Sequence, residues 1–188
     1  MIVKKKEIHE RETESAKFEK SNAVKYWIIT LLFLPIFAFS QSETPAPYTK
    51  VKGLPPIVLT QLDNKELTSE DIRGKSTILM FFSPDCGHCK DQIAEMLKNS
   101  RELAKYQWVL ATFQPEAEIR SFYDHYKLKN YSNIKIGRDA KFLLPPFFRI
   151  RNLPYLALYD AKGNLITTFE GNVKSHVLLS AFQQGKAK

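Results

Sequence analysis

The chain has 188 residues, enough for one domain with appended segments, and its content of 44% hydrophobic and 12% aromatic residues supports a packed core. The formal net charge is +8, but the 28 basic and 20 acidic residues are interspersed, and no run of aromatic and basic residues resembles a nucleic-acid surface. We therefore predict no nucleic-acid partner. The positive charge is interpreted first as a solvated surface, with attraction to an anionic membrane or acidic partners as the alternative.

The start of the chain has the features of an export signal. Residues 1–24 are polar and charged without a sustained apolar stripe, and we expect them to form a disordered tail. An apolar run from Ile28 to Phe39 follows a basic and aromatic flank and ends in Ala38-Phe39-Ser40, with small residues at the cleavage-site positions before Gln41. Residues 25–40 therefore predict a secretory signal peptide and a location in the periplasm or cell envelope.

Two alternatives to a cleaved signal of this kind stay open. An uncleaved signal would tether the protein to a membrane through residues 26–39, although this run is shorter than the about 20 residues of a comfortable span. The signal also begins far from Met1, so a translation start near Val24 would give it an ordinary length. Residues 41–51, rich in proline and polar groups, then predict a linker.

The folded domain is expected over residues 52–184, with residues 185–188 as a short tail. It opens with a strand from Ile57 to Leu62, a turn, and a short returning strand, Glu66-Leu67-Thr68. Together these predict an N-terminal β-hairpin. A single helical turn is expected next, at 69–72.

The next stretch contains the chain's only cysteines, Cys86 and Cys89. The apolar run from Ile78 to Phe82 predicts a buried strand that ends in a short turn. The turn leads into a helix that begins near Cys86 and has Ile93 and Met96 on its apolar face. A C-x-x-C pair between a strand and a helix is typical of a redox-active dithiol.

This placement suits disulfide exchange, which requires a thiolate. Cys86 would lie at the helix N-terminus, where unpaired N–H groups and the helix dipole favour negative charge. Cys89, one turn further along, would be more buried and would attack second. His88 would donate a hydrogen bond or place a positive charge beside the thiolate, which favours the dithiol form. The dithiol itself would be the redox centre, and no other cofactor or metal is predicted.

Three other roles for a cysteine pair compete with this interpretation. Structural zinc needs about four Cys or His ligands, and only His9, His88, His125 and His176 accompany the cysteines. Covalent haem attachment needs C-x-x-C-H, but Lys90 stands in the position of the histidine. A purely structural disulfide stays open, although closing so short a loop stabilises little.

The second half of the chain predicts alternating strands and helices. The helix after the cysteines is expected to end near Ala104, and Pro115 to occupy the first position of the following helix. In chain order we expect a strand over 108–113, a helix over about 116–128, a short strand at 134–136, an irregular helical stretch over 139–148, strands over 155–159 and 165–169 that form an antiparallel hairpin, and a closing helix over about 173–182.

The order of the elements and two motifs resemble a known family. The order β-β-α-β-α-β-α-β-β-α, the run from Phe82 to Lys90 and the run from Leu153 to Gly163 resemble the thioredoxin-like superfamily, and within it the TlpA/ResA-like extracytoplasmic thiol-disulfide oxidoreductases. The Cys-Gly-His-Cys-Lys motif, with Gly87 and His88 between the cysteines, also resembles the active site of protein disulfide isomerase. The resemblance implies an α/β fold of three layers, with a central mixed β-sheet flanked by helices and an N-terminal β-hairpin extension.

The resemblance also implies roles for individual residues. Cys86 would be the nucleophile, Cys89 the resolving thiol, and Pro154 a cis proline that faces the disulfide. In the family, the backbone before this proline pairs with an extended substrate chain, so Leu153 should contact the substrate.

Two positions depart from the family pattern. Many thioredoxins carry a buried acid six residues before the first cysteine, where this chain has Met80. The neighbouring Asp85 is a candidate substitute, and its other interpretation is a turn or helix-capping acid. Leu153 also stands where a small or β-branched residue is common.

The sequence thus predicts an exported, monomeric thiol-disulfide oxidoreductase that exchanges disulfides with protein thiols and works with a thiol electron donor or acceptor. A disulfide-permissive compartment fits the export signal. Reduction, oxidation and isomerisation all stay open as its direction. One alternative is a peroxiredoxin-like peroxide reductase, for which Ser83 stands where a Thr-x-x-Cys pattern has threonine. The other is a non-catalytic thioredoxin-like binding module.

Overall fold

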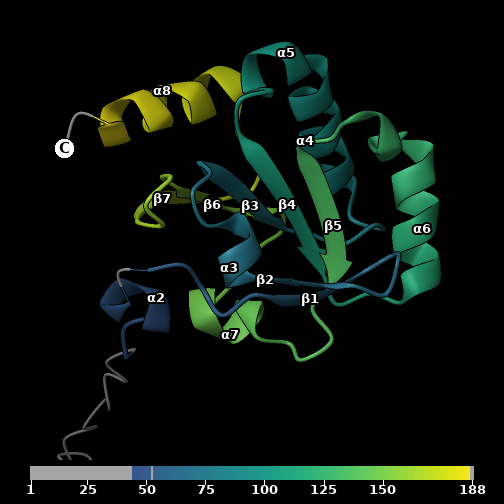
Figure 1. The fold of residues 1–188 in the computed structure, drawn as a ribbon, viewed down its shortest axis with the longest axis horizontal. Coiled ribbons are helices and arrows are strands. Elements are labelled where there is room, and N and C mark those ends of the chain that lie inside the picture. The colour runs from purple at the N-terminus through teal and green to yellow at the C-terminus, as the bar shows by residue number, and fades with distance from the viewer. Residues whose placement is uncertain (1–43, 52, 187–188) are drawn as a thin grey trace, which may run out of the picture. The chain divides into compact units, whose positions relative to one another are not determined.

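A seven-stranded β-sheet with the order β2-β1-β5-β4-β3-β6-β7 forms the centre of the computed structural model, which describes residues 44–186 except Lys52 (Figure 1). β3, β4 and β5 run parallel to one another, whereas β1, β2, β6 and β7 are antiparallel to their neighbours. The sheet is therefore mixed, as the sequence predicts. The strands are β1 (Val58–Gln61), β2 (Glu66–Thr68), β3 (Thr77–Phe81), β4 (Gln107–Thr112), β5 (Ile134–Arg138), β6 (Tyr155–Tyr159) and β7 (Leu165–Glu170).

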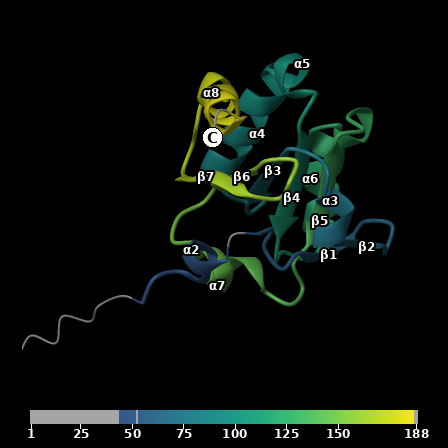
Figure 2. The ribbon, with the colours of Figure 1, turned by 60° about the vertical axis from the view of Figure 1, so that its left-hand side comes forward.

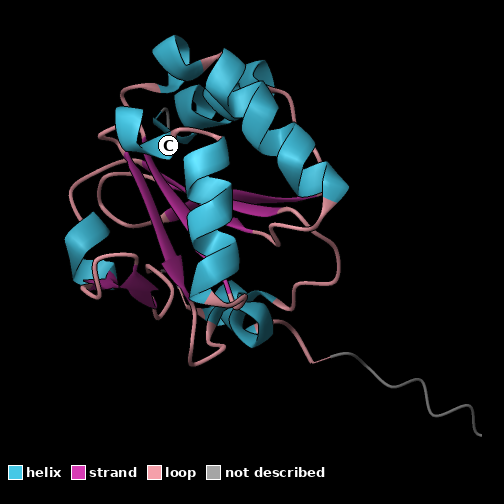
Figure 3. Ribbon diagram, turned by 90° about the vertical axis from the view of Figure 1, so that its right-hand side faces the viewer, coloured by secondary structure: helices cyan, strands magenta, loops and turns pink. Residues whose placement is uncertain are grey.

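Helices cover both faces of this sheet, which gives three layers. One buried cluster joins the strands to α4, α5, α6 and α8, and a second joins the opposite face to α2, α3 and α7. Figure 3 shows helices of the first group in front of the strands, and Figure 2 shows α2 and α7 together at the opposite side. The helices are α2 (Pro47–Lys50), α3 (Ser69–Ile72), α4 (Gly87–Lys98), α5 (Ser100–Leu103), α6 (Glu116–His125), α7 (Leu144–Phe148) and α8 (Ser175–Lys186), with a 3₁₀ turn η1 (Leu128–Asn130).

The central strands are continuous apolar runs because both of their faces are covered. Every residue of β3, β4 and β6 is buried. In β3, Ile78 and Met80 enter the cluster that holds α4, while Leu79 and Phe81 enter the cluster that holds α7. This alternation follows from the two-residue period of a strand.

Both predicted hairpins are present as antiparallel pairs. β1 pairs with β2, with Leu59 opposite Leu67. β6 pairs with β7, with Ala157 opposite Thr168. In the turn of the second hairpin, Gly163 has a φ of 85°, a left-handed conformation that favours glycine.

The helix that follows the cysteines is shorter than predicted. It was expected to continue to about Ala104, but α4 ends at Lys98 and α5 begins at Ser100. Asn99 between them leaves the helical region, with a φ of −106° and a ψ of 28°. Its side-chain amide donates a hydrogen bond to the Glu95 carbonyl at 2.8 Å, and such side-chain bonds compete with the helix backbone.

The helix after β4 also ends early. α6 stops at His125 rather than near residue 128, because Lys127 adopts a left-handed φ of 51° that cannot continue an α-helix. Pro115 is the N-cap residue of α6 instead of its first helical residue. The predicted helix thus begins at Glu116 as expected, and its end comes three residues early.

The ends of the folded unit differ from the sequence-based boundaries. The unit begins at Thr44, and part of the segment expected as a linker forms α2, whose Tyr48 ring packs 5.6 Å from the Phe148 ring of α7. At the other end, Gly185 and Lys186 belong to α8, although a tail was expected over 185–188. The predicted tail over 1–24 and the predicted signal or tether lie outside the described residues.

Candidate functional site

The turn after β3 places Cys86 at the start of α4. The Phe82 N–H donates to the Ala111 carbonyl at 3.0 Å, which keeps the chain beside β4 beyond the end of β3. The Cys86 N–H then donates to the Ser83 carbonyl at 3.1 Å. The side chain of Gln114 donates to the Ser83 hydroxyl at 3.3 Å. Backbone and side-chain bonds therefore both hold the turn that carries the cysteine.

Cys86 is the N-cap residue of α4, and its side chain is partly exposed. Its backbone is extended, with a φ of −73° and a ψ of 118°, and its Sγ accepts a hydrogen bond from the Cys89 N–H at 3.2 Å. That N–H is one of the donors that a helix start leaves without an intrahelical partner. A thiolate here would be stabilised by this directed N–H group and by the helix dipole.

Cys89 lies one turn further along α4 in the opposite environment. Its side chain is fully buried in the cluster that also contains Ile93 and Met96. Burial, reinforced by the hydrogen bond and charge of Cys86, raises the pKa of the Cys89 thiol to about 12, although a hydrogen bond with the Ser83 backbone lowers it in part. Cys89 therefore keeps its proton at neutral pH while Cys86 faces the solvent.

The loop before β6 brings a backbone carbonyl to the cysteine. The peptide bond between Leu153 and Pro154 is cis, as the family resemblance implies, and Pro154 is buried. The Cys86 Sγ lies 4.0 Å from the Leu153 carbonyl oxygen, in a direction that suits a thiol donor. Residues 67 positions apart in the chain thus face each other across the site.

The remaining predicted site residues lie on the exposed rim. Asp85, Gly87 and His88 are all exposed. Among the described residues, no hydrogen bond joins the side chain of Asp85 or His88 to either sulfur. The structure therefore brings together Cys86, Cys89 and the Leu153 carbonyl, and leaves Asp85 and His88 beside them at the surface.

Comparison with known proteins agrees with this architecture. The profile of the AhpC/TSA family matches residues 45–182, which is most of the chain. The chain belongs to the AhpC/TSA family. Comparison with curated proteins gives no match.

Several solved structures share the fold of this AhpC/TSA family member. A secreted Mycobacterium tuberculosis disulfide oxidoreductase has 17% identity and a TM-score of 0.57, with 68% of this chain and 95% of that chain covered. An exposed lipoprotein thioredoxin of Streptococcus pneumoniae has 22% identity and a TM-score of 0.56, with 68% and 98% covered. StoA from Bacillus subtilis has 18% identity and a TM-score of 0.53, with 67% and 95% covered. These likenesses confirm the predicted thioredoxin-like fold.

Within residues 44–186, Lys52 apart, no group of three or more His, Cys, Asp or Glu side chains is arranged to hold a metal ion. In the same part of this AhpC/TSA family chain, no helix combines the length and apolar character that crossing a membrane requires. The predicted tether at 26–39 lies outside this part.

Sequence reasoning missed Gln92, a polar residue on the buried side of α4. Only 1% of its surface is exposed, and its side chain bonds to both backbone groups of Val173, in the segment after β7. The signal was available in the sequence, because position 92 falls on the same helical face as Cys89 and Ile93. A buried amide within an apolar stripe indicates a specific partner.

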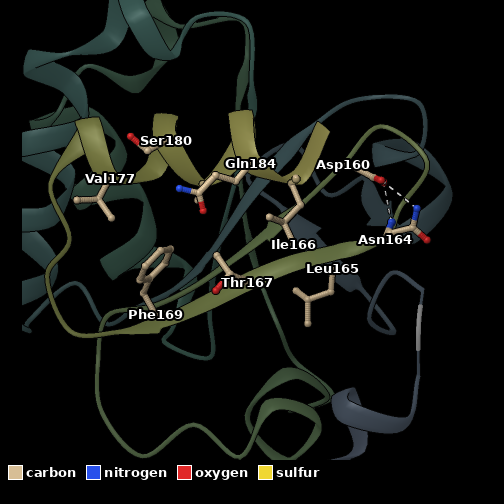
Figure 4. A pocket seen from close by; sticks show the side chains of 11 residues that line it. Asp160, Asn164, Leu165, Ile166, Thr167, Phe169, Val177, Ser180 and Gln184 are labelled. Carbon is tan, nitrogen blue, oxygen red and sulfur yellow. Dashed lines mark hydrogen bonds between the residues drawn. The ribbon is translucent and has the colours of Figure 1, made fainter. Parts of the chain in front are cut away.

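A cavity of about 630 Å³ lies between β7 and α8, and Figure 4 shows Ile166, Phe169 and Val177 around it. Neither cysteine lines it. Helix and strand approach closely at Gly185, since a Cβ there would lie 2.9 Å from the Ile166 Cγ2 atom. The cavity is thus separate from the cysteine pair at the start of α4.

Proposed function

We propose that this AhpC/TSA family member is a thiol-disulfide oxidoreductase whose redox centre is the Cys86–Cys89 pair. The observation that carries the proposal is the contrast within one helical turn: Cys86 is a partly exposed N-cap, whereas Cys89 is buried with a pKa raised to about 12. Disulfide exchange needs one accessible thiolate and one partner thiol held in reserve. The thioredoxin-like fold and family membership support the same conclusion.

The first step forms a mixed disulfide. The Cys86 thiolate attacks one sulfur of a substrate disulfide, and the other substrate sulfur leaves as a thiolate that takes a proton from water. The Cys89 N–H and the α4 dipole stabilise the Cys86 thiolate before the attack. The Leu153 carbonyl beside Cys86 would accept a backbone N–H from an extended substrate chain.

The second step releases the substrate. Cys89 loses its proton and attacks the Cys86 sulfur of the mixed disulfide, so that the second substrate sulfur leaves as a thiolate. Two electrons have then passed from the dithiol to the substrate, and Cys86 and Cys89 share a disulfide. A protein thiol donor reverses the process to restore the dithiol. In the opposite direction, substrate thiols would pass their electrons to the Cys86–Cys89 disulfide, and an acceptor disulfide would then reoxidise the pair.

Turnover of a peptide disulfide tests the proposal. The full chain should reduce an oxidised peptide with dithiothreitol as the electron source, and Cys86→Ser should abolish this activity. A non-catalytic binding module would show no turnover. A peroxide reductase would consume hydrogen peroxide at a comparable or higher rate, so the same protein should be assayed with both substrates. The reduction potential then gives the direction, with about −270 mV typical of a reductant and about −120 to −180 mV of an oxidant or isomerase.

We further propose that the protein acts outside the cytoplasm, in the periplasm or cell envelope. The signal-like pattern ending at Ser40 supports this location. So do two proteins with a similar fold, of which one is described as secreted and the other as an exposed lipoprotein. N-terminal sequencing of protein from the cell envelope should find Gln41 first, or an intact N-terminus if residues 26–39 are a tether. Full-length protein confined to the cytosol would overturn the proposal.

A further inference from the structure

Residues 170–175, from the last residue of β7 to the first residue of α8, bond to both walls of the site, and we call them the bridging segment. It leaves β7 and rises to α8 at one side of the sheet (Figure 2). One wall of the site is the start of α4, which carries Cys86. The other wall is the loop over residues 151–154, which carries the Leu153 carbonyl.

On the helix side, the bridging segment bonds to the first two turns of α4. The Asn172 side-chain amide donates to the His88 carbonyl at 3.1 Å. The Val173 N–H donates to the Gln92 Oε1 at 2.7 Å, and the Gln92 Nε2 donates back to the Val173 carbonyl at 3.0 Å. The Ser175 N–H donates to a carboxylate oxygen of Glu95 at 3.2 Å.

On the loop side, the same segment bonds to the chain around the cis peptide. The Glu170 carboxylate accepts hydrogen bonds from the Arg151 N–H at 3.4 Å and from the Asn152 side-chain amide at 3.1 Å. The Gly171 N–H donates to the Pro154 carbonyl at 2.8 Å. The first two residues of this short segment therefore bond to the loop, and the later ones bond to α4.

The distance between the walls decides what the site can hold. The direct polar contact between them, from the Cys86 Sγ to the Leu153 carbonyl, is 4.0 Å long and weak. The bonds from the bridging segment are shorter, and Gln92, which makes two of them, is buried. Buried polar groups that are all satisfied hold one arrangement, because breaking either bond leaves an unpaired group.

We propose that Glu170, Asn172 and Gln92 are positioning residues that set the spacing between the Cys86 sulfur and the Leu153 carbonyl, and thereby select disulfides within extended polypeptides. The proposal rests on the proposed function. It distinguishes two parts of that function. Thiol chemistry needs only Cys86 and Cys89, whereas docking of a peptide backbone needs both walls at the correct separation.

Substitutions at two exposed residues test the spacing between the Cys86 sulfur and the Leu153 carbonyl without altering the core. Asn172→Ala removes the bond to the His88 carbonyl, and Glu170→Ala removes both bonds to the loop. Ser180→Ala is the matched control, since it removes an exposed hydroxyl bond within α8 that touches neither wall. Each protein is assayed with intact insulin, whose chains are joined by disulfides, as the peptide disulfide, and with hydroxyethyl disulfide, which has no peptide backbone.

We expect Asn172→Ala and Glu170→Ala each to raise KM for the peptide disulfide about tenfold, the effect of losing a hydrogen-bonded arrangement. Their kcat/KM for hydroxyethyl disulfide should stay within about twofold of the unsubstituted protein. Glu170→Gln keeps one acceptor oxygen and should give an intermediate KM for the peptide disulfide. Ser180→Ala should leave KM and kcat/KM unchanged for both disulfides.

An equal fall in kcat/KM for both disulfides, or an unchanged KM for the peptide disulfide, would overturn the positioning role. A lack of turnover of either disulfide by the unsubstituted protein would refute the proposed function instead. The two failures are therefore distinguishable in one set of assays.

Discussion

The two cysteines of α4 share a helix, a residue type and a hydrogen bond, yet their surroundings are opposite. Cys86 ends an extended segment and is partly exposed, while Cys89 is sealed in the core beside the apolar residues of the same helix. Cys86 and Cys89 are three positions apart and so share one face of the helix, and the difference comes from their positions along it: Cys86 is the N-cap, whereas Cys89 lies one turn further in. In the proposed exchange, Cys86 would therefore attack first.

The same contrast extends to their neighbours. On the outer side, Asp85, Gly87 and His88 are exposed and leave room for a partner. On the inner side, Ile93 and Gln92 are buried and anchor the helix to the core and to the bridging segment. Substitutions on the outer side should therefore alter reactivity, and those on the inner side should alter stability.

The largest expected effect is a difference between the two cysteine variants in how much mixed disulfide they trap. Cys89→Ser should trap a covalent mixed disulfide with an oxidised peptide, because Cys86 can still attack and nothing can release the product. Cys86→Ser should trap almost none, since a thiol with a pKa of about 12 is ionised in roughly one molecule in ten thousand at pH 8. Non-reducing gels of the two variants measure the trapped fraction. Equal trapping, or trapping by Cys86→Ser alone, would reverse the assignment.

A second test compares the two sides of α4 by stability. Ile93→Ala removes a fully buried side chain and should lower the free energy of unfolding by about 2–5 kcal/mol. His88→Ala changes an exposed side chain and should stay within about 0.5 kcal/mol. Urea unfolding of the reduced proteins gives both values. Similar losses would mean that the outer side is as structural as the inner one.

A third test uses pH. Burial raises the pKa of Cys89 to about 12 in the folded protein, whereas a thiol in an unfolded chain titrates near about 8.5. Between these values the unfolded chain has lost the proton that the folded protein keeps, so the unfolding free energy of the reduced protein falls as pH rises. Cys89 leaves the unfolding free energy unchanged below about pH 8.5 and lowers it above that pH by up to about 1.4 kcal/mol per pH unit.

Cys89→Ser provides the control for this pH dependence, because a hydroxyl does not titrate in the range. Burial also raises the pKa of Tyr155 and of Tyr159, which destabilises both proteins alike at high pH. The difference between the two stability curves therefore isolates Cys89. Parallel curves from pH 8 to pH 10 would show that the thiol is not held in its neutral form.

Most of the fold was predictable because its central strands have clear patterns. The runs that form β3, β4 and β6 are apolar throughout, and the turn at Gly163 has the chemistry of a hairpin. The break at Asn99 was not predictable, because the apolar periodicity continues past it and its marker, the side-chain bond from Asn99 to the Glu95 carbonyl, shows only in the structure. α2 was hidden by its proline-rich composition, and it forms where Tyr48 can pack on Phe148.

The site was predictable only where its residues are close in sequence. Cys86, Cys89 and the start of α4 follow from local spacing and helix chemistry. The cis peptide at Pro154 was expected solely from the family resemblance. The bridging segment could not be foreseen, since its bonds to α4 join residues 80 to 84 positions apart in the chain, as between Val173 and Gln92. Such pairings depend on how β7 and α8 are placed by the whole fold.

The smallest expected effect concerns His88, on the outer side. It lies two positions after Cys86 in the first turn of α4, where a donor or positive charge stabilises a thiolate and so favours the dithiol. Proline is tolerated at this position, because the N–H groups of a first helical turn have no intrahelical partner to lose. His88→Pro should therefore keep the helix and remove only the stabilisation of the thiolate.

We expect His88→Pro to lower the reduction potential of the Cys86–Cys89 couple by about 30 mV, which is a tenfold change in the exchange equilibrium. Equilibration with glutathione, followed by alkylation of free thiols, measures the potential. Gly87→Ala is the matched control at the neighbouring position, since a Cβ there would have no atom within 4 Å. It should leave the potential unchanged. If His88→Pro leaves the potential unchanged or raises it, the histidine does not stabilise the thiolate. The outer side of α4 would then tune the couple only through the helix start that it shares with Cys86.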